Sequence, residues 1–125
     1  MIEYPKLAGT PTSHLPFSPC TKFGELLFVS GQASVDGTGQ IIPDTFDGEM
    51  RRSVANLKTV LENAGSGMAH ILQTRNYVRD SADLPEFNRI YAELFTAPYP
   101  ARTTITNCLP PSLKYEIECV AVVPD

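Results

Sequence analysis

Two segments of this chain are apolar on both of the faces that a β-strand presents. Residues 26–29 are Leu-Leu-Phe-Val, and residues 120–123 are Val-Ala-Val-Val. Successive side chains of a strand point to opposite faces of its sheet, so a strand of this kind needs a covering layer on both sides. A fold for this chain must supply that cover, and this requirement constrains it more than any other feature.

Two amphipathic helices are predicted between the strand-like segments. In the first, apolar residues recur at intervals of 4, 4, 3 and 4 and form one stripe: Phe46, Met50, Val54, Leu57 and Leu61. Asp44 or Thr45 can cap its start, and Gly65 follows its end. In the second, Asp83 and Glu86 have the spacing of a capping box. Its apolar face is formed by Leu84, Phe87, Ile90, Tyr91, Leu94 and Phe95.

The predicted order is strands, helix, strand, helix and two final strands, which is that of a single α+β domain over residues 1–125. Two helices can cover one face of such a sheet, and no further segment is left for the other face. An apolar sheet face of that size is rare on the surface of a monomer. We therefore expect a symmetric homo-oligomer whose sheets pack on one another.

Residues 98–104 and 113–123 are interpreted as two antiparallel strands joined by a connection that contains Pro110 and Pro111. Arg102 lies near the start of the first strand, and Glu116 and Glu118 share one face of the second. A cation and a carboxylate on neighbouring strands suit the binding of a small carboxylic acid and the positioning of a water. Spacing alone leaves a second interpretation open, in which Arg102 is the structural ion-pair partner of Glu116 or Glu118.

The remaining segments are expected to be connections. Residues 1–19 are rich in proline and are interpreted as an extended or irregular lead-in with at most a short edge strand. Turns are expected at 24–25 and 36–39. Residues 30–32, Ser-Gly-Gln, are expected to end the strand that begins at Leu26, with Gly31 as a bulge or as a point of close backbone approach to a ligand.

The composition disfavours several function classes. The formal net charge is −4, and no block of Lys and Arg stands out, so nucleic acid is not an expected partner. No run of about 18 apolar residues and no secretion signal is present, so we expect a cytoplasmic protein without a membrane partner. Cys20, Cys108 and Cys119 lack CxxC spacing, and His14 and His70 lie far apart, so free thiols and no metal site are expected.

Several short motifs occur in the order seen in one protein family. They are Pro-Phe-Ser at 16–18, Phe-Val-Ser-Gly-Gln at 28–32, Asn-Leu at 56–57, Leu-Glu-Asn-Ala-Gly at 61–65, Phe-Asn-Arg-Ile-Tyr at 87–91, Pro-Tyr-Pro-Ala-Arg-Thr at 98–103, Leu-Pro at 109–110 and Glu-Ile-Glu at 116–118. In these motifs the chain resembles the Rid family, the reactive intermediate deaminases, also called YjgF-type and formerly endoribonuclease L-PSP. The resemblance covers nearly the whole chain, and the segments 100–103 and 116–118 are its most specific part.

The resemblance implies a chorismate-mutase-like α+β fold, with a mixed, mostly antiparallel sheet that two helices cover on one face, assembled as a homotrimer. It also implies clefts between subunits that hydrolyse 2-imino acids, or their 2-enamino tautomers, to 2-keto acids and ammonia. The implied partners are the small imino acid and further copies of the same chain. The family's reaction uses no metal and no organic cofactor.

The site residues that the resemblance implies follow from the matching positions. Arg102 would bind the substrate carboxylate through its bidentate fork, and Glu116 would orient or deprotonate the attacking water and return a proton to the leaving amine. The residues expected to line the site are Phe17, Ser30, Gly31, Asn88, Arg102 and Thr104.

Three departures from the family pattern leave the substrate open. Phe17 replaces the usual tyrosine of an aromatic lid, Pro19 stands where a glutamine is frequent, and residues 104–108 are Thr-Ile-Thr-Asn-Cys instead of a valine-glutamate-valine pattern. A larger enamine, such as a 2-aminomuconate-like acid, is one alternative substrate. A non-catalytic trimer that binds small acids or acts as a chaperone is an alternative function. Ribonuclease activity is disfavoured by the acidic balance and by the lack of a paired histidine or basic site.

Overall fold

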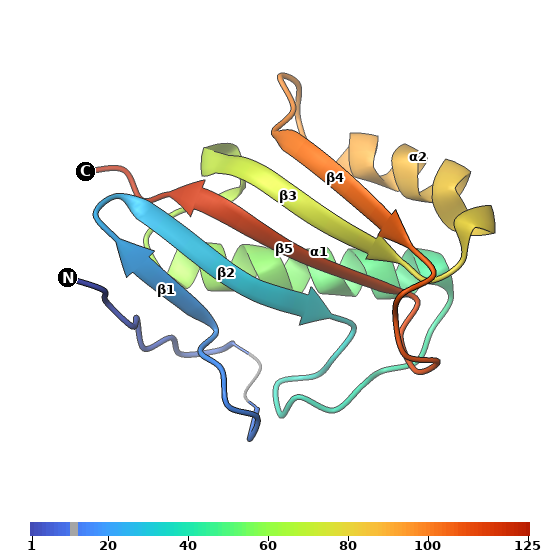
Figure 1. Cartoon of the computed structure of the whole chain (residues 1–125), viewed down its shortest axis with the longest axis horizontal. Coiled ribbons are helices and arrows are strands. Elements are labelled where there is room, and N and C mark those ends of the chain that lie inside the picture. The colour runs from blue at the N-terminus through green and yellow to red at the C-terminus, as the bar shows by residue number, and fades with distance from the viewer. Residues whose placement is uncertain (11–12) are drawn as a thin grey trace.

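The computed structural model describes residues 1–10 and 13–125, so two residues of the expected lead-in, 11 and 12, lie outside the described part. The elements in chain order are β1 (Cys20–Phe23), β2 (Leu26–Ala33), α1 (Phe46–Asn63), β3 (Ile71–Val78), α2 (Leu84–Leu94), β4 (Ala101–Thr106) and β5 (Tyr115–Val122), with short 3-10 helices at Met68–His70 and Ser81–Asp83. The strands form one sheet in the order β1-β2-β5-β3-β4 (Figure 1). The lead-in contributes an isolated bridge between Glu3 and Lys22.

The sheet is mixed and mostly antiparallel, as predicted. β2 pairs antiparallel with β1 and β5, and β5 pairs antiparallel with β3, whereas β3 and β4 are parallel. Parallel neighbours need a crossover connection, and α2 supplies it between β3 and β4. The expectation that β4 and β5 are neighbouring strands is therefore wrong, because β3 lies between them.

The two helices form where the apolar periodicity predicts them. The Thr45 side chain accepts a hydrogen bond from the Gly48 amide at 3.1 Å and caps α1, and Gly65 adopts a φ of 86° just after the helix. The capping box expected for α2 is not formed, since the Asp83 side chain makes no cap hydrogen bond. Asp80 instead accepts from the Ala82 amide at 2.9 Å and caps the short 3-10 helix that leads into α2.

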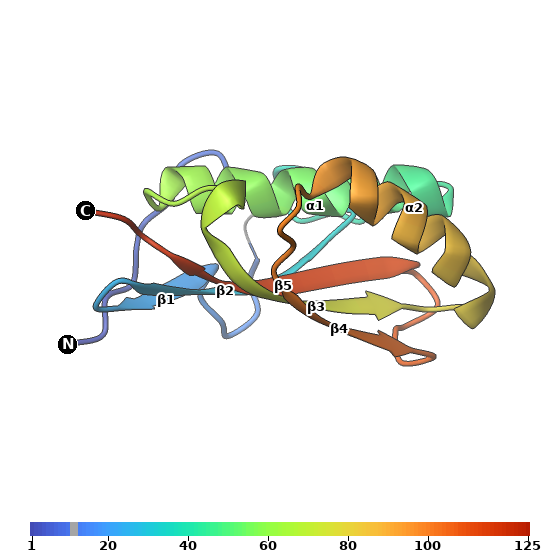
Figure 2. The same ribbon diagram turned by 90° about the horizontal axis from the view of Figure 1, so that it is seen from above.

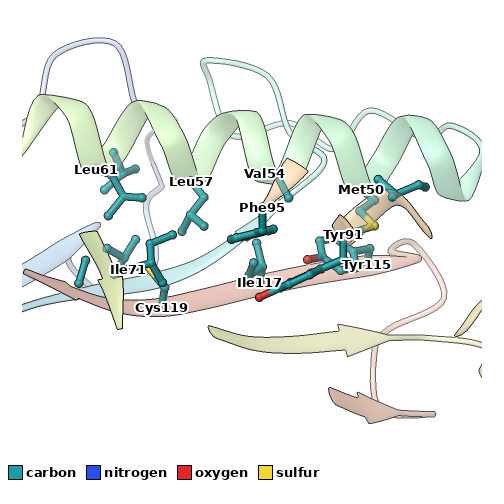
Figure 3. Packing of buried hydrophobic residues seen from close by; sticks show 14 of the residues in the cluster. Met50, Val54, Leu57, Leu61, Ile71, Tyr91, Phe95, Tyr115, Ile117 and Cys119 are labelled. Carbon is teal, nitrogen blue, oxygen red and sulfur yellow. The ribbon is translucent and has the colours of Figure 1, made fainter. Parts of the chain in front are cut away.

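Both helices lie on the same face of the sheet (Figure 2). The core fills the space between them and the strands, and Figure 3 shows Leu57 and Leu61 of α1 pointing toward Ile117 and Cys119 of β5. α1 and α2 are amphipathic, and neither has the length and apolar character of a membrane-spanning helix. The predicted α+β class is thus confirmed, with the two helices covering one face.

The other face of the sheet has no covering layer within the described residues. Leu26, Phe28 and Ile105 point to this face and are 39%, 45% and 37% exposed. Leu26 pairs with Val122 and Phe28 with Val120, so apolar side chains lie side by side across β2 and β5. The sequence predicted this uncovered apolar face, and the packing of further copies against it stays a prediction.

β2 does not end at residues 30–32, as the sequence suggested, but continues to Ala33 through a shift in register between Val29 and Gln32. Gly31 lies in this bulge. The bulge adds a residue to β2 relative to β5, so the strand bends without losing its partner. The interpretation of Gly31 as a bulge position is therefore confirmed, and the predicted strand end is wrong.

A buried carboxylate ties the start of α1 to the start of β5. Glu49 is completely buried, and its oxygens accept hydrogen bonds from the amides of Asp44 at 3.2 Å and Lys114 at 3.0 Å. The Lys114 ammonium lies 3.3 Å from the same carboxylate and donates to the Asp44 carbonyl at 2.6 Å. Since Lys114 precedes β5 directly, this cluster fixes where Tyr115 and Glu116 begin the strand.

We predict that Glu49→Ala lowers the free energy of unfolding by about 2–3 kcal/mol, because it leaves two amide donors and an ammonium without their shared acceptor. Urea unfolding at one fixed protein concentration measures the effect. The control is Glu62→Ala, an exposed position on the same helix, which should change the stability by no more than about 0.5 kcal/mol. Equal losses in the two variants would contradict the role assigned to Glu49.

Candidate active site

Arg102 is held against two aromatic rings of α2. Its guanidinium carbon lies 5.0 Å from the ring centroid of Phe87 and 5.0 Å from that of Tyr91. Both rings are buried, while Arg102 itself is exposed. A guanidinium at this distance from an aromatic face gains about 0.5–2 kcal/mol per contact and loses conformational freedom. The side chain is therefore kept on the helix side of β4.

Among the residues that the structure describes, none pairs with the polar donors of Arg102. Within residues 1–10 and 13–125, the ion pairs of the chain involve other arginines and lysines, and none joins Arg102 to a carboxylate. Arg102 borders a crevice of about 350 Å³ together with Asn88, Tyr91, Tyr99 and other residues of the same surface. An uncompensated guanidinium beside a crevice is suited to bind an anion from solution.

Two further predicted residues lie on this side of the sheet. Thr104 is two residues after Arg102 on β4, and its hydroxyl oxygen is buried without a hydrogen-bond partner among the described residues. An unpaired buried hydroxyl is costly unless a ligand or water satisfies it. Asn88 is exposed at the crevice, and its amide nitrogen donates to the Leu84 carbonyl at 3.1 Å.

A chain of buried hydrogen bonds lies beneath Arg102. The Tyr115 hydroxyl donates to Asn76 Oδ1 at 2.6 Å, Asn76 Nδ2 donates to Thr74 Oγ1 at 3.1 Å, and Thr74 Oγ1 and the Tyr91 hydroxyl are 2.8 Å apart. Desolvation raises the pKa of Tyr91 and, more strongly, that of Tyr115, so both phenols stay protonated. The chain fixes the Tyr91 ring on which Arg102 rests.

Glu116 lies on the opposite face of the sheet. Its neighbours Tyr115 and Ile117 point into the core, so the Glu116 side chain points to the uncovered face. Its carboxyl group packs against Gly31, where a Cβ atom would lie 3.0 Å from Cδ and 3.1 Å from Oε2 of Glu116. A glycine in the β2 bulge thus leaves the space that this carboxyl group occupies.

The environment of Glu116 disfavours its charged form. Desolvation raises the pKa of this carboxyl group above its ordinary value, and the nearby Glu118 carboxylate raises it further. Glu118 itself accepts a hydrogen bond from the Tyr77 hydroxyl and lies 3.6 Å from the Arg75 guanidinium. Glu116 is therefore the carboxylate of this pair that is placed to exchange protons.

Glu116 borders a second, larger cavity of about 500 Å³, which Phe17 and Gly31 also line. Ser30 does not line this cavity. Its hydroxyl donates to the Ser18 carbonyl at 2.6 Å and borders a smaller hollow with Phe28 and Glu118. Within the described residues, no group of three or more His, Cys, Asp or Glu side chains is placed to hold a metal ion.

The predicted site residues thus form two groups. Arg102, Asn88 and Thr104 lie on the helix side near α2 and β4. The second group, which lies around the β2 bulge and β5, consists of Phe17, Ser30, Gly31 and Glu116. Since β3 and the plane of the sheet separate the groups, Arg102 forms no ion pair with Glu116 or Glu118 in this chain.

The sequence alone did not reveal the aromatic support of Arg102. Phe87 and Tyr91 were assigned to the core from their helical spacing, which is correct for both rings. Their four-residue separation places them side by side on α2, so it is the signal from which a paired platform is recognisable. Their contact with Arg102 was not predictable, because it depends on β4 lying next to β3.

Comparison with known proteins gives a consistent result. A family model described as Endoribonuclease L-PSP matches residues 8–123. Reactive Intermediate Deaminase A, chloroplastic, from Arabidopsis thaliana is 31% identical over 115 residues, which is 90% of this chain and 62% of the relative. A 2-iminobutanoate/2-iminopropanoate deaminase from Dermatophagoides farinae is 28% identical over 110 residues, 86% of each chain. The crystal structure of a putative endoribonuclease L-PSP from Entamoeba histolytica superposes with a TM-score of 0.88 at 31% identity, covering 98% and 99% of the two chains.

We predict that Glu116→Gln raises the melting temperature at neutral pH. The folded-state pKa of Glu116 lies above the unfolded value, so the glutamate destabilises the fold increasingly as the pH rises through that window. Below the unfolded pKa, where Glu116 is protonated in both states, the gain should vanish. Melting curves between pH 3 and 8 measure it, with Glu25→Gln in the exposed β1–β2 turn as the control. A gain that does not depend on pH would contradict the assigned cause.

Proposed function

Because the chain belongs to the Rid family, described by its family model as Endoribonuclease L-PSP, we propose that it hydrolyses reactive 2-imino acids to 2-keto acids and ammonia. The observation that carries the proposal is the free guanidinium of Arg102, which rests on two rings beside a crevice and has an unpaired hydroxyl next to it. Relatives at 28% and 31% identity are named as deaminases, which supports the same reaction class.

In the proposed reaction, Arg102 binds the substrate carboxylate through two parallel hydrogen bonds and thereby fixes the adjacent C=N carbon. Asn88 lines the same crevice, and Thr104, with its unpaired hydroxyl, lies two residues after Arg102 on β4. Phe17, Gly31 and Glu116 line the opposing wall, with Ser30 beside it. Holding the reacting carbon at a fixed place is expected to remove several kcal/mol of the barrier.

Glu116 then serves as the base and the acid. A water oxygen attacks the C=N carbon of the protonated imine while one water proton passes to the Glu116 carboxylate, which gives a neutral tetrahedral carbinolamine. The Glu116 carboxylic acid returns this proton to the amine nitrogen and the C–N bond breaks. Ammonia leaves, and the hydroxyl proton passes to the Glu116 carboxylate as the hydroxyl becomes the keto group. A carboxyl group whose pKa is raised suits both steps, because its two protonation states lie closer in free energy near neutral pH.

The two groups of site residues meet only if different copies of the chain contribute them. We therefore propose the homotrimer that the family resemblance implies, with Arg102 of one subunit facing Glu116 of the next across a shared cleft. The uncovered apolar face, with Phe28 and Ile105 exposed, supports close packing of copies.

The first test concerns the guanidinium group of Arg102. We expect Arg102→Ala to lower kcat/KM for imine hydrolysis by about a hundredfold or more, and Arg102→Lys to recover little, since an ammonium lacks the planar fork. Melting temperatures should fall by only a few degrees, because the exposed side chain loses its two ring contacts but no ion pair. A variant that loses its fold would support a structural role for Arg102. If small carboxylic acids raise the melting temperature but no imine is hydrolysed, the protein binds such acids and the proposed hydrolysis is refuted.

A second test asks whether the site is shared. Arg102→Ala and Glu116→Gln subunits, each inactive by itself, are co-expressed with different tags and purified through both tags. If each site takes Arg102 and Glu116 from different subunits, every mixed trimer that both tags retain carries both intact residues at about a third of its interfaces, and a corresponding share of the activity should return. Mixed assemblies that stay as inactive as the single variants would contradict the shared site.

A further inference from the structure

Both aromatic rings that support Arg102 are themselves supported by the buried chain of hydrogen bonds beneath them. At one end of this chain, the Tyr91 hydroxyl lies 2.8 Å from Thr74 Oγ1. At the other end, the ring of Tyr115 packs against Phe87, with 6.0 Å between the ring centroids. Phe87 and Tyr91 also contact each other, at 5.7 Å. The two rings are therefore held through the chain as well as by one another.

Thr74 and Asn76 form the middle of the chain and lie beside the strand that carries Arg102. Thr74 is paired with Arg102 in the register of β3 and β4, and residues paired in this way point to the same face of the sheet. Asn76 Nδ2 donates to Thr74 Oγ1 at 3.1 Å, and Asn76 Oδ1 accepts from the Tyr115 hydroxyl at 2.6 Å. Both residues of β3 are completely buried, and neither borders the crevice beside Arg102. They can therefore affect a ligand of Arg102 only through their neighbours.

Stability alone does not account for this chain. Buried polar side chains that are paired with one another can be replaced by apolar ones of similar shape at little cost to the fold. An apolar core would not provide direction, because the hydrophobic effect is non-directional whereas a hydrogen bond depends on its angle. The chain therefore fixes the orientation of its members, and of the Tyr91 ring, more closely than packing alone.

The chain brings no negative charge to the guanidinium. Desolvation raises the pKa of Tyr91 and of Tyr115 above the ordinary value, and this outweighs the nearby charge of Arg102, which lowers it. The side chains of Thr74 and Asn76 do not ionise. Arg102 is thus held by ring faces and neutral hydrogen-bonding groups, so its charge stays available to an anion, whereas a carboxylate in the same place would neutralise it.

We propose that the three members of this chain that belong to the sheet are positioning residues, which act through the rings of α2 to hold the Arg102 guanidinium in the orientation that binds a carboxylate. They are Thr74, Asn76 and Tyr115. The inference rests on the proposed function, since the carboxylate is taken to be that of the substrate. A guanidinium that is already oriented loses less conformational freedom on binding, so the chain increases the affinity for carboxylates without touching them.

A matched pair of substitutions at Thr74 separates the hydrogen bonds from packing. Thr74→Val keeps the shape and removes the hydroxyl, whereas Thr74→Ser keeps the hydroxyl and removes a methyl group. We expect Thr74→Val to raise the Kd of the assembled protein for pyruvate, measured by calorimetry, and the KM for imine hydrolysis by about fivefold. The kcat should change by less than about twofold, because a bound carboxylate restores the orientation of the guanidinium.

Thr74→Ser should keep Kd and KM within about twofold of the unaltered protein. Equal weakening in the two variants would assign the effect to packing of the methyl group and would overturn the inference. Unchanged affinity in Thr74→Val would overturn it as well, whatever happens to the melting temperature.

Leu61→Val is the control for lost stability. Leu61 is a fully buried residue of α1 and lies at the far end of the core from Tyr91 (Figure 3). The substitution removes a buried methylene, so it should lower the melting temperature. It should leave Kd and KM within about twofold, because the chain stays intact. A rise in Kd as large as that of Thr74→Val would show that affinity follows general stability, which would count against the chain.

Removal of the far end of the chain tests whether its members act in series. Tyr115→Phe keeps the ring against Phe87 and removes the hydrogen bond to Asn76, so it should raise the Kd for pyruvate by a smaller factor, about twofold. Once Thr74→Val has interrupted the chain, the further change Tyr115→Phe should have no added effect on this Kd. Two effects that multiply in the double variant would contradict the series.

Nuclear magnetic resonance separates this inference from the proposed reaction. The Nε–H signal of Arg102 is identified by its loss in Arg102→Lys, and its nitrogen relaxation reports how firmly the guanidinium is held without any ligand. We expect an ordered Nε–H bond in the unaltered protein and in Leu61→Val, and a more mobile one in Thr74→Val. Unchanged order in Thr74→Val would refute the inference even if imines are hydrolysed. If the order falls as expected and no imine is hydrolysed, only the proposed reaction is refuted.

Discussion

Two helices cover only one face of this sheet, and most features of the molecule follow from that constraint. Side chains alternate along each strand, so every strand sends half of its residues toward the helices and half toward the open face. Arg102 of β4 points to the helix side and Glu116 of β5 to the open side. The strand β3 lies between them. A single copy of the chain therefore presents a cation and a carboxylate that cannot reach the same ligand, and the proposed chemistry depends on assembly.

The sequence predicted those features that depend on local periodicity. The stripe from Phe46 to Leu61 and the apolar face around Phe87 and Tyr91 identified the helices, and alternation along residues 115–122 separated core residues from Glu116 and Glu118. Strand order was not predicted correctly. The proline-containing connection between β4 and β5 allows β5 to pair with β4 directly, but it also allows β3 to lie between them. The pairing is decided by the crossover through α2, which is a tertiary effect.

In the candidate site too, local sequence features were predicted and tertiary contacts were not. Residue types and family resemblance identified Arg102, Glu116 and Gly31, whose surroundings in the structure suit the proposed roles. The aromatic platform of Arg102 and the deep position of Thr74 and Asn76 depend on which strands are neighbours, so they could not be derived from spacing. The supporting residues of a site are set by tertiary contacts, whereas the reactive residues are recognisable by their chemistry.

The two sides of the proposed site differ in their chemistry: one holds a cation in place, and the other exchanges a proton. Arg102 carries a fixed charge, and its aromatic platform is tied to the core through the Tyr91–Thr74 hydrogen bond. Glu116 can take or release a proton, because burial and Glu118 bring its two forms closer in free energy near neutral pH. An acid that binds Arg102 would therefore be positioned by the guanidinium and transformed by the Glu116 carboxyl group. Neither residue could serve in the surroundings of the other. A buried arginine would need a carboxylate of the protein to compensate its charge, and a fully solvated glutamate would be a weaker base.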